Sequence, residues 1–180
     1  MSQLTIFADH GGMTPTLRTD DPAVIASQLG AVGVRFEQWQ ASQPIAAGAS
    51  QEAVLAAYRS DVDRLVAEAG YQTVDVISLN ASHPDKAALR EKFLSEHTHS
   101  EDEVRFFVAG RGLFSLHIGS SVYEVLCEKG DLISVPANTP HWFDMGSEPD
   151  LVAIRFFDNP EGWVARFTGS AIAEQFSRLP

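Results

Sequence analysis

Residues 103–146 read EVRFFVAGRGLFSLHIGSSVYEVLCEKGDLISVPANTPHWFDMG, and residues 151–158 add LVAIRFFD. Short runs rich in β-branched and aromatic residues follow one another here, and Gly, Ser, Asn or Pro separates them. Runs spaced roughly 8–12 residues apart, with turn residues between them, are typical of a β-sandwich or β-barrel. With the β-branched run at residues 73–79, the pattern predicts a barrel core at about residues 73–158.

Helical patterns surround this predicted core. Asp21 and Pro22 are suited to the N-cap and the first position of a helix. Ser50 caps the clearest amphipathic pattern, which Gly70 ends. We predict helices at residues 22–33, 50–70, 84–93 and 170–176, and further strands at 4–7 and 34–39. The prediction is a mainly β, α+β chain of one domain over residues 1–180, in which 1–72 and 159–180 are helical and strand additions to the barrel.

Charge and composition exclude several classes of function. The chain has 13 Lys and Arg against 24 Asp and Glu, a net charge of −11. Since this charge repels polyanions and no basic stripe opposes it, we expect neither nucleic acid nor membrane as a partner. No apolar run exceeds six residues, which is too short for a membrane span. The N-terminus does not resemble a signal peptide and Cys127 is the only cysteine, so a cytosolic protein is expected.

The segment EHTHSEDE at residues 96–103 concentrates the chemistry. His97 and His99 point to the same side of an extended strand, because alternate side chains share a face. Glu103 opens the next strand, and His141 follows a turn that contains two prolines. Three neutral imidazoles and a carboxylate suit iron, nickel, manganese or zinc. Four protein ligands on an octahedral ion leave two adjacent positions for a substrate. The other three histidines have no such context, and we interpret them as surface or satisfied core residues: His10, His83 and His117.

These residues also resemble the two motifs of the cupin superfamily. His97, His99, Glu103 and Gly110 match the first motif, and the segment from Gly130 through Pro136 to His141 matches the second. The match departs from the general pattern at three positions: Glu91 and Asn138 replace glycines, and Met145 replaces an asparagine. Longer strings are similar to the acireductone dioxygenase family over nearly the whole chain: EKFLSEHTHSEDEVRFFVAGRGLFSLHIG, VLCEKGDLISVPANTPHWFDMG, IRFFDNPEGW, GVRFEQW and YQTVDVISL.

The resemblance implies a monomeric, cytosolic jelly-roll barrel that holds one Fe(II) or Ni(II) ion through His97, His99, Glu103 and His141. Its implied substrates are O₂ and acireductone, 1,2-dihydroxy-5-(methylthio)pent-1-en-3-one, an intermediate of methionine salvage. The iron form of the family yields 4-methylthio-2-oxobutanoate and formate. The nickel form yields 3-(methylthio)propionate, formate and carbon monoxide.

The resemblance also assigns roles to residues that are not ligands. It implies that Arg105 stabilises the substrate dianion, and that Glu96 and Asp102 serve metal incorporation and conformational coupling. From the residues alone, Arg105 could instead form a salt bridge with Glu101 or Asp102, and the two carboxylates could orient the ligand imidazoles. The predicted walls for the methylthio tail are aromatic residues that also suit a plain core: Phe93, Phe143 and Trp163.

Two other functions share the four ligands. One is a different metal-dependent cupin, such as another dioxygenase or a sugar isomerase. The other is a cupin binding module without catalytic activity, although such a module would normally have lost one or more ligands. Metal analysis combined with oxygen uptake on acireductone distinguishes the three.

Overall fold

The structure is a computed structural model that describes residues 1–159 and 163–180. Its strands are β1 (Gln3–Ala8), β2 (Pro15–Thr19), β3 (Arg35–Gln38), β4 (Thr73–Leu79), β5 (His97–Thr98), β6 (Glu103–Ile118), β7 (Ser121–Glu128), β8 (Asp131–Val135), β9 (His141–Asp144), β10 (Leu151–Phe157) and β11 (Arg166–Phe167). The helices are α1 (Pro22–Gly30), α2 (Gln51–Ala57), α3 (Arg59–Ala69), α4 (Lys86–Leu94) and a 3-10 helix, η1 (Ile172–Gln175). Among the described residues, no helix has both the length and the apolar character needed to cross a membrane.

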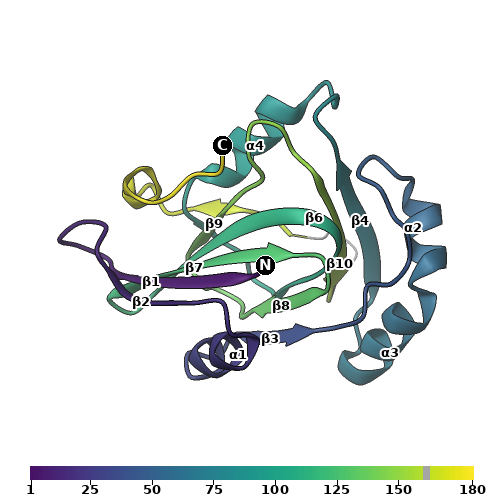
Figure 1. The fold of residues 1–180 in the computed structure, drawn as a ribbon, viewed down its shortest axis with the longest axis horizontal. Coiled ribbons are helices and arrows are strands. Elements are labelled where there is room, and N and C mark those ends of the chain that lie inside the picture. The colour runs from purple at the N-terminus through teal and green to yellow at the C-terminus, as the bar shows by residue number, and fades with distance from the viewer. Residues whose placement is uncertain (160–162) are drawn as a thin grey trace.

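The strands form two antiparallel sheets that share β6. One sheet has the order β11-β5-β9-β6-β7-β1-β2, and the other has the order β3-β8-β6-β10-β4. Figure 1 shows the sheets curved around a common interior, with α1 beside β3 and with α2 and α3 outside β4. The expected β-barrel of cupin type, with helices around it, is therefore confirmed.

Side-chain alternation along β6 explains why the second sheet is buried on both faces. Phe107 belongs to the core between the sheets, which also contains residues of β1, β7, β8 and β9. Val104, Phe106 and Val108 point to the opposite face, where they form a second core with α2 and α3. Alternate residues of a strand point to opposite faces, so a continuous apolar run such as that of β6 fits a strand covered on both sides.

β6 is one strand of 16 residues, whereas the sequence predicted two. Its first part pairs with β8 and β10, and its second part pairs with β7 and β9. The strand passes from one sheet to the other at Gly110, which has a φ of +66°. A Cβ atom at this position would lie 1.8 Å from the carbonyl oxygen of Asp150. Only glycine fits this close approach, which explains a glycine inside a continuous strand.

The predicted helix at residues 50–70 is divided at Tyr58. This residue has φ −115° and ψ 23°, outside the helical region, and separates α2 from α3. Its ring packs edge-on against Phe106 at 5.5 Å, and its hydroxyl donates to the carbonyl of Gln43. Tertiary contacts of Tyr58 thus override the local helical pattern. The predicted N-cap is confirmed, since the side chain of Asp21 accepts from the N–H of Ala23. The predicted C-terminal helix is the short η1.

Replacing Gly112 with alanine is expected to lower the free energy of unfolding by about 1–3 kcal/mol. A Cβ atom there would lie 2.3 Å from Cζ of the buried Phe143 ring, so the ring would have to move. Gly30→Ala is the matched control, because no atom lies within 4 Å of its Cβ position and its φ is not positive. Urea unfolding of both variants checks the prediction, and equal stability of the two would contradict it.

Candidate metal centre

Three imidazoles converge from neighbouring strands. His97 lies on β5, His99 directly follows that strand, and His141 is the first residue of β9. His97 and His141 are register partners across β5 and β9. One ring nitrogen from each of the three residues lies within 4.8 Å of the others, and all three residues are buried. The described residues thus place three nitrogen ligands around one point inside the barrel.

Main-chain carbonyls fix the orientation of each ring. Nδ1 of His97 and Nδ1 of His141 lie 2.7 Å from the carbonyl oxygens two residues before them, those of Ser95 and Thr139. Nδ1 of His99 lies 3.1 Å from the carbonyl oxygen of Val164. A carbonyl only accepts hydrogen bonds, so each Nδ1 carries the hydrogen. In the neutral imidazoles the Nε2 lone pairs therefore remain available for a metal ion.

Glu103 completes the centre from the start of β6. Its Oε2 lies 2.8 Å from Nε2 of His141 and 3.0 Å from Nε2 of His99. Each Nδ1 already holds a hydrogen, so lone pairs of two neutral imidazoles and a carboxylate would face one another. A cation between them removes this repulsion, and nitrogen with carboxylate oxygen is a donor set of divalent transition metals. The residues present therefore fit a metal ion.

The pKa shifts of His97 and Glu103 agree with this donor set, whereas Glu103 outweighs burial and raises the pKa of His141, which favours a proton where the ion would bind. Burial, and to a smaller extent the nearby His141, lowers the pKa of His97 to about 4, so the imidazole of His97 is neutral at pH 7. Burial alone would raise the pKa of Glu103, but Arg105 and His141 outweigh burial and hold it well below its usual value. A neutral imidazole and an ionised carboxylate are the forms that bind metal.

The turn that precedes His141 explains one departure from the general cupin motif. Asn138 has a φ of +63°, the only positive φ among the described non-glycine residues. Asparagine tolerates this left-handed conformation better than most residues, so it replaces glycine here. The N–H of Asn138 donates to the carbonyl of His99 at 2.7 Å. The turn is thereby tied to the segment of β5 and His99 that carries the first two imidazoles.

Arg105 lies on β6 beside Glu103 and is 1% exposed. Its Nη2 lies 2.9 Å from Oε1 of Glu103. The alternative of a surface salt bridge with Glu101 or Asp102 is therefore wrong. Within the described chain, its Nε and Nη1 have no hydrogen-bond partner. The guanidinium lies 4.5 Å from the ring centroid of Phe143 and 5.4 Å from that of Trp163. A buried guanidinium with unpaired donors is suited to an anionic ligand.

Glu96 and Asp102 do not contact the three imidazoles. Glu96 lies 2.8 Å from Nδ1 of His117 and accepts from the hydroxyl of Thr168. Asp102 accepts from the N–H of Ala137, in the turn before His141. The structure thus corrects the interpretation that these carboxylates orient the ligand imidazoles, because main-chain carbonyls do so. His117 is satisfied by carboxylates, as expected.

A cavity of about 330 Å³ opens beside the imidazoles. The described residues that line it are Lys92, Phe93, His97, His99, Glu103, Arg105, Phe143, Arg155, Trp163, Val164, Ala165 and Phe167. All three aromatic residues predicted as walls are in this lining. Part of the string IRFFDNPEGW, residues 160–162, lies outside the described residues.

Sequence reasoning missed Arg155, which also lines the cavity. It is the register partner of Arg105 across β6 and β10, and Asp75 on β4 neutralises it through two contacts of 2.7 and 2.6 Å. A signal was present in the sequence, since Arg155 is the one charged residue in the apolar run LVAIRFF. A charge inside such a strand needs a partner or a function.

Three buried imidazoles and a carboxylate inside an antiparallel barrel, beside a cavity, define a metal-binding cupin. The sequence matches the family described as ARD/ARD' over residues 3–165, and the chain belongs to this family. Proteins named acireductone dioxygenase from Cronobacter sakazakii and Klebsiella pneumoniae are 64% and 63% identical to it, each over 99% of both chains. A solved structure, acireductone dioxygenase from Bacillus anthracis with a cadmium ion in the active centre, superposes with a TM-score of 0.82. The two chains are 33% identical over 93% of this chain and 98% of the other.

Lowering the pH is expected to destabilise the metal-free protein through His97. Its pKa is about 4 in the folded chain and 6.5 ordinarily. Between these values the unfolded chain binds a proton that the folded chain does not, so stability falls as the pH falls through this window. In His97→Gln this contribution disappears. Urea unfolding of the chelator-treated wild type and variant at about pH 7 and pH 5 checks this prediction. An equal loss of unfolding free energy in the two proteins would contradict it.

Proposed function

We propose that this protein is an acireductone dioxygenase that cleaves acireductone with O₂ in methionine salvage. The observation that carries the proposal is the convergence of three Nε2 atoms and Glu103 beside a buried guanidinium with unpaired donors. High identity over nearly the full length to proteins with this name supports it. We also infer that residues 1–180 form one domain that acts as a cytosolic monomer.

The proposed ligands of the ion are His97, His99, Glu103 and His141, with one Fe(II) or Ni(II) per chain. When bound, the ion supplies a Lewis acid that holds the enediolate oxygens of the substrate and stabilises their charge. The acceptors on Nδ1 keep the imidazoles in the tautomer that binding requires. The carboxylate of Glu103 also neutralises Arg105 before substrate arrives.

Arg105 is proposed to stabilise the negative charge of the substrate dianion. Its Nε and Nη1 lack protein partners among the described residues, so they are free to donate to a substrate oxygen. The buried position makes such a contact stronger than it would be in water. Phe93, Phe143 and Trp163 are proposed to contact the methylthio tail and to exclude water around it. Glu96 and Asp102 keep their proposed roles in metal incorporation and conformational coupling.

The experiment that tests this function is oxygen uptake by metal-reconstituted protein with acireductone as the substrate. Rapid, enzyme-dependent loss of acireductone with formation of formate is the expected result. The proposal would be overturned if protein that binds one transition-metal ion per chain did not raise the rate of acireductone oxidation above that measured without protein. Elemental analysis on the same sample establishes the metal content, so an unloaded protein is not mistaken for an inactive one.

We further expect the product to follow the metal. One ligand set would serve both ions, since the described residues hold one cluster of His, Cys, Asp or Glu side chains suited to a metal ion. The metal is removed from a single batch of protein, which is then divided into two halves. One half is reloaded anaerobically with Fe(II) and the other with Ni(II). Carbon monoxide and 3-(methylthio)propionate should form only with nickel, and 4-methylthio-2-oxobutanoate mainly with iron. Identical products from both halves would contradict this expectation.

A further inference from the structure

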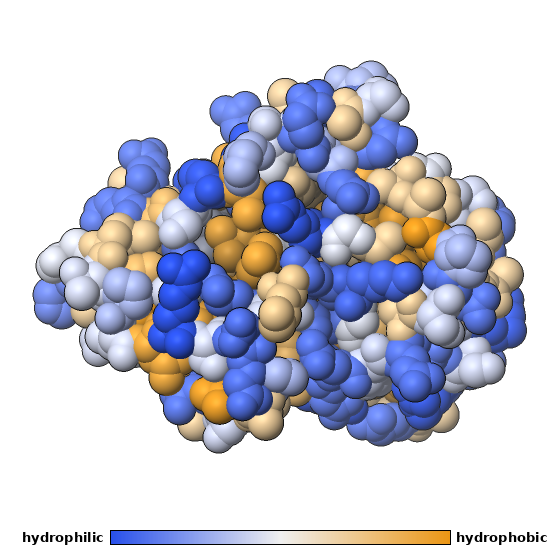
Figure 2. Space-filling model, viewed as in Figure 1, coloured by the Kyte–Doolittle hydropathy of each residue, from blue (hydrophilic) through white to orange (hydrophobic). Residues whose placement is uncertain are grey.

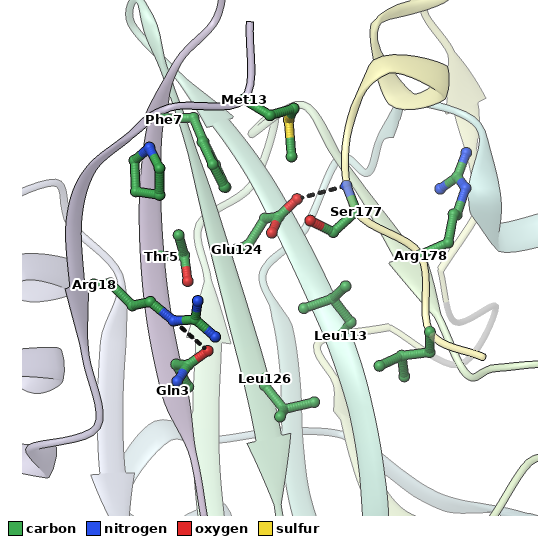
Figure 3. A pocket seen from close by; sticks show the side chains of 12 residues that line it. Gln3, Thr5, Phe7, Met13, Arg18, Leu113, Glu124, Leu126, Ser177 and Arg178 are labelled. Carbon is green, nitrogen blue, oxygen red and sulfur yellow. Dashed lines mark hydrogen bonds between the residues drawn. The ribbon is translucent and has the colours of Figure 1, made fainter.

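A second cavity lies on the outer face of the sheet that contains β1, β7 and β6. Its volume is about 510 Å³. Figure 3 shows its floor, formed by β1, β7 and β6, with Met13 above it and the C-terminal segment around Ser177 along one side. Glu124 lies on this floor, and the next residue, Val125, belongs to the core between the sheets. Because neighbouring side chains on a strand point to opposite faces, this cavity and the metal centre lie on opposite sides of the sheet.

Glu124 is a buried carboxylate that the proposed reaction does not use. It is 5% exposed, and burial raises its pKa above the usual value. The N–H of Ser177 donates to its Oε1 at 2.8 Å. No Lys, Arg or His within the described ranges forms an ion pair with it. A buried carboxylate without an ion-pair partner is costly, and the hydrogen bonds from Ser177 and the charge of Arg178 offset the effect of burial only in part.

Both arginines of the lining leave this carboxylate unpaired. Arg18 donates from Nε to the side-chain oxygen of Gln3 at 3.1 Å. Figure 3 shows Arg178 on the far side of the C-terminal segment, pointing away from Glu124. Neither arginine therefore forms an ion pair with Glu124, although the charge of Arg178 partly offsets the effect of burial on its pKa. Glu124 lines the cavity, where its carboxylate can accept from a ligand.

The rest of the lining is mainly apolar. The apolar residues are Phe7, Met13, Pro15, Leu113, Leu126 and Leu179. Figure 2, in the same view as Figure 1, shows hydrophobic residues in a hollow left of the centre of this face, between strongly hydrophilic residues. An apolar cavity of some hundreds of Å³ with a few fixed polar groups is typical of a small-molecule site.

We propose that this cavity binds an alkylammonium ligand, that is, a primary amine on an apolar chain. The ammonium group would donate to Glu124, and the chain would contact Leu113, Leu126 and Leu179. An anion is disfavoured because Glu124 repels it. A metal ion is disfavoured because a single carboxylate among apolar side chains is too few ligands. A polyamine is disfavoured because Arg18 at the rim repels a second positive charge.

The test is a titration of the metal-loaded protein with n-hexylammonium, n-hexanol and hexanoate, followed by ¹H–¹⁵N spectra. Changes in the amide chemical shifts of Thr5, Glu124 and Ser177 are expected. Hexylammonium should bind about tenfold more tightly than hexanol. Hexanoate should bind most weakly. Equal affinity of the amine and the alcohol, or shifts confined to residues around the metal centre, would overturn the proposal.

Two variants separate the ligand contact from a structural role. Glu124→Gln keeps an acceptor oxygen for the N–H of Ser177 but removes the charge, so hexylammonium should bind no more tightly than hexanol. Leu126→Trp should weaken binding of both, because the larger side chain fills the cavity. Glu52→Gln, on the exposed surface of α2, is the matched control and should bind as the wild type does. Unchanged hexylammonium affinity in a folded Glu124→Gln variant would also overturn the proposal.

Discussion

Replacing Arg105 with alanine is expected to lower kcat/KM for acireductone by about 10³-fold. The guanidinium is almost fully buried, and two of its nitrogens have no protein partner among the described residues. Removing it takes away the donors proposed to meet the substrate dianion, inside a site where water cannot replace them. Oxygen uptake at saturating and limiting acireductone measures the effect on kcat and KM separately.

Arg105→Lys and Arg111→Ala make this prediction specific. Lysine keeps the charge but not the forked donors, so it should restore only part of the activity. Arg111 lies on the same strand but is exposed, and its replacement should leave kcat/KM unchanged. Metal content should stay high in all three variants, since Arg105 is not a proposed ligand. Wild-type turnover in Arg105→Ala would contradict the proposed electrostatic role.

Replacing His99 with alanine is expected to weaken metal binding by more than about 100-fold and to abolish turnover. Loss of an orienting partner alone costs about 10–100-fold in metal affinity, and loss of a direct ligand should cost more. Elemental analysis after dialysis and calorimetric titration with Ni(II) measure the change. The same result is expected for alanine variants of His97, Glu103 and His141.

His10→Ala is the matched control for this series. The His10 side chain is 83% exposed and contacts Asp9, away from the three converging imidazoles. It should retain one ion per chain and full activity. A folded alanine variant of His97, His99, Glu103 or His141 that keeps its full metal content would remove that residue from the proposed ligand set.

Local patterns predicted much of the fold and the location of the candidate site. The spacing of His97 and His99 is that of side chains on one face of an extended chain, so the sequence shows that these two imidazoles can share a face. The N-cap at Asp21 and the strand Thr73–Leu79 depend on neighbours in sequence, and both agree with the structure. The replacement of glycine by Asn138 is explained by a backbone conformation that these two residue types share.

Features that depend on distant contacts could not be predicted from local patterns. The helix break at Tyr58 results from packing on Phe106, which is distant in sequence. The ion-pair partner of Arg105 depends on the direction in which its side chain points in the folded protein. The sequence could therefore not show whether this partner is Glu103, Glu101 or Asp102. From the residues alone Glu96 and Asp102 could accept the imidazole protons, whereas the structure uses main-chain carbonyls, whose positions only the folded chain defines.

The use of carbonyls as imidazole acceptors has a consequence for how this site tolerates sequence change. Ser95, Thr139 and Val164 each contribute a carbonyl oxygen, which every amino acid possesses. Substitutions at these three positions that preserve the backbone path can therefore accumulate without changing which nitrogen of each ligand binds the ion. Genetic drift at the three positions that orient the imidazoles therefore does not change the coordination chemistry. Selection at the centre acts mainly on the ligands themselves.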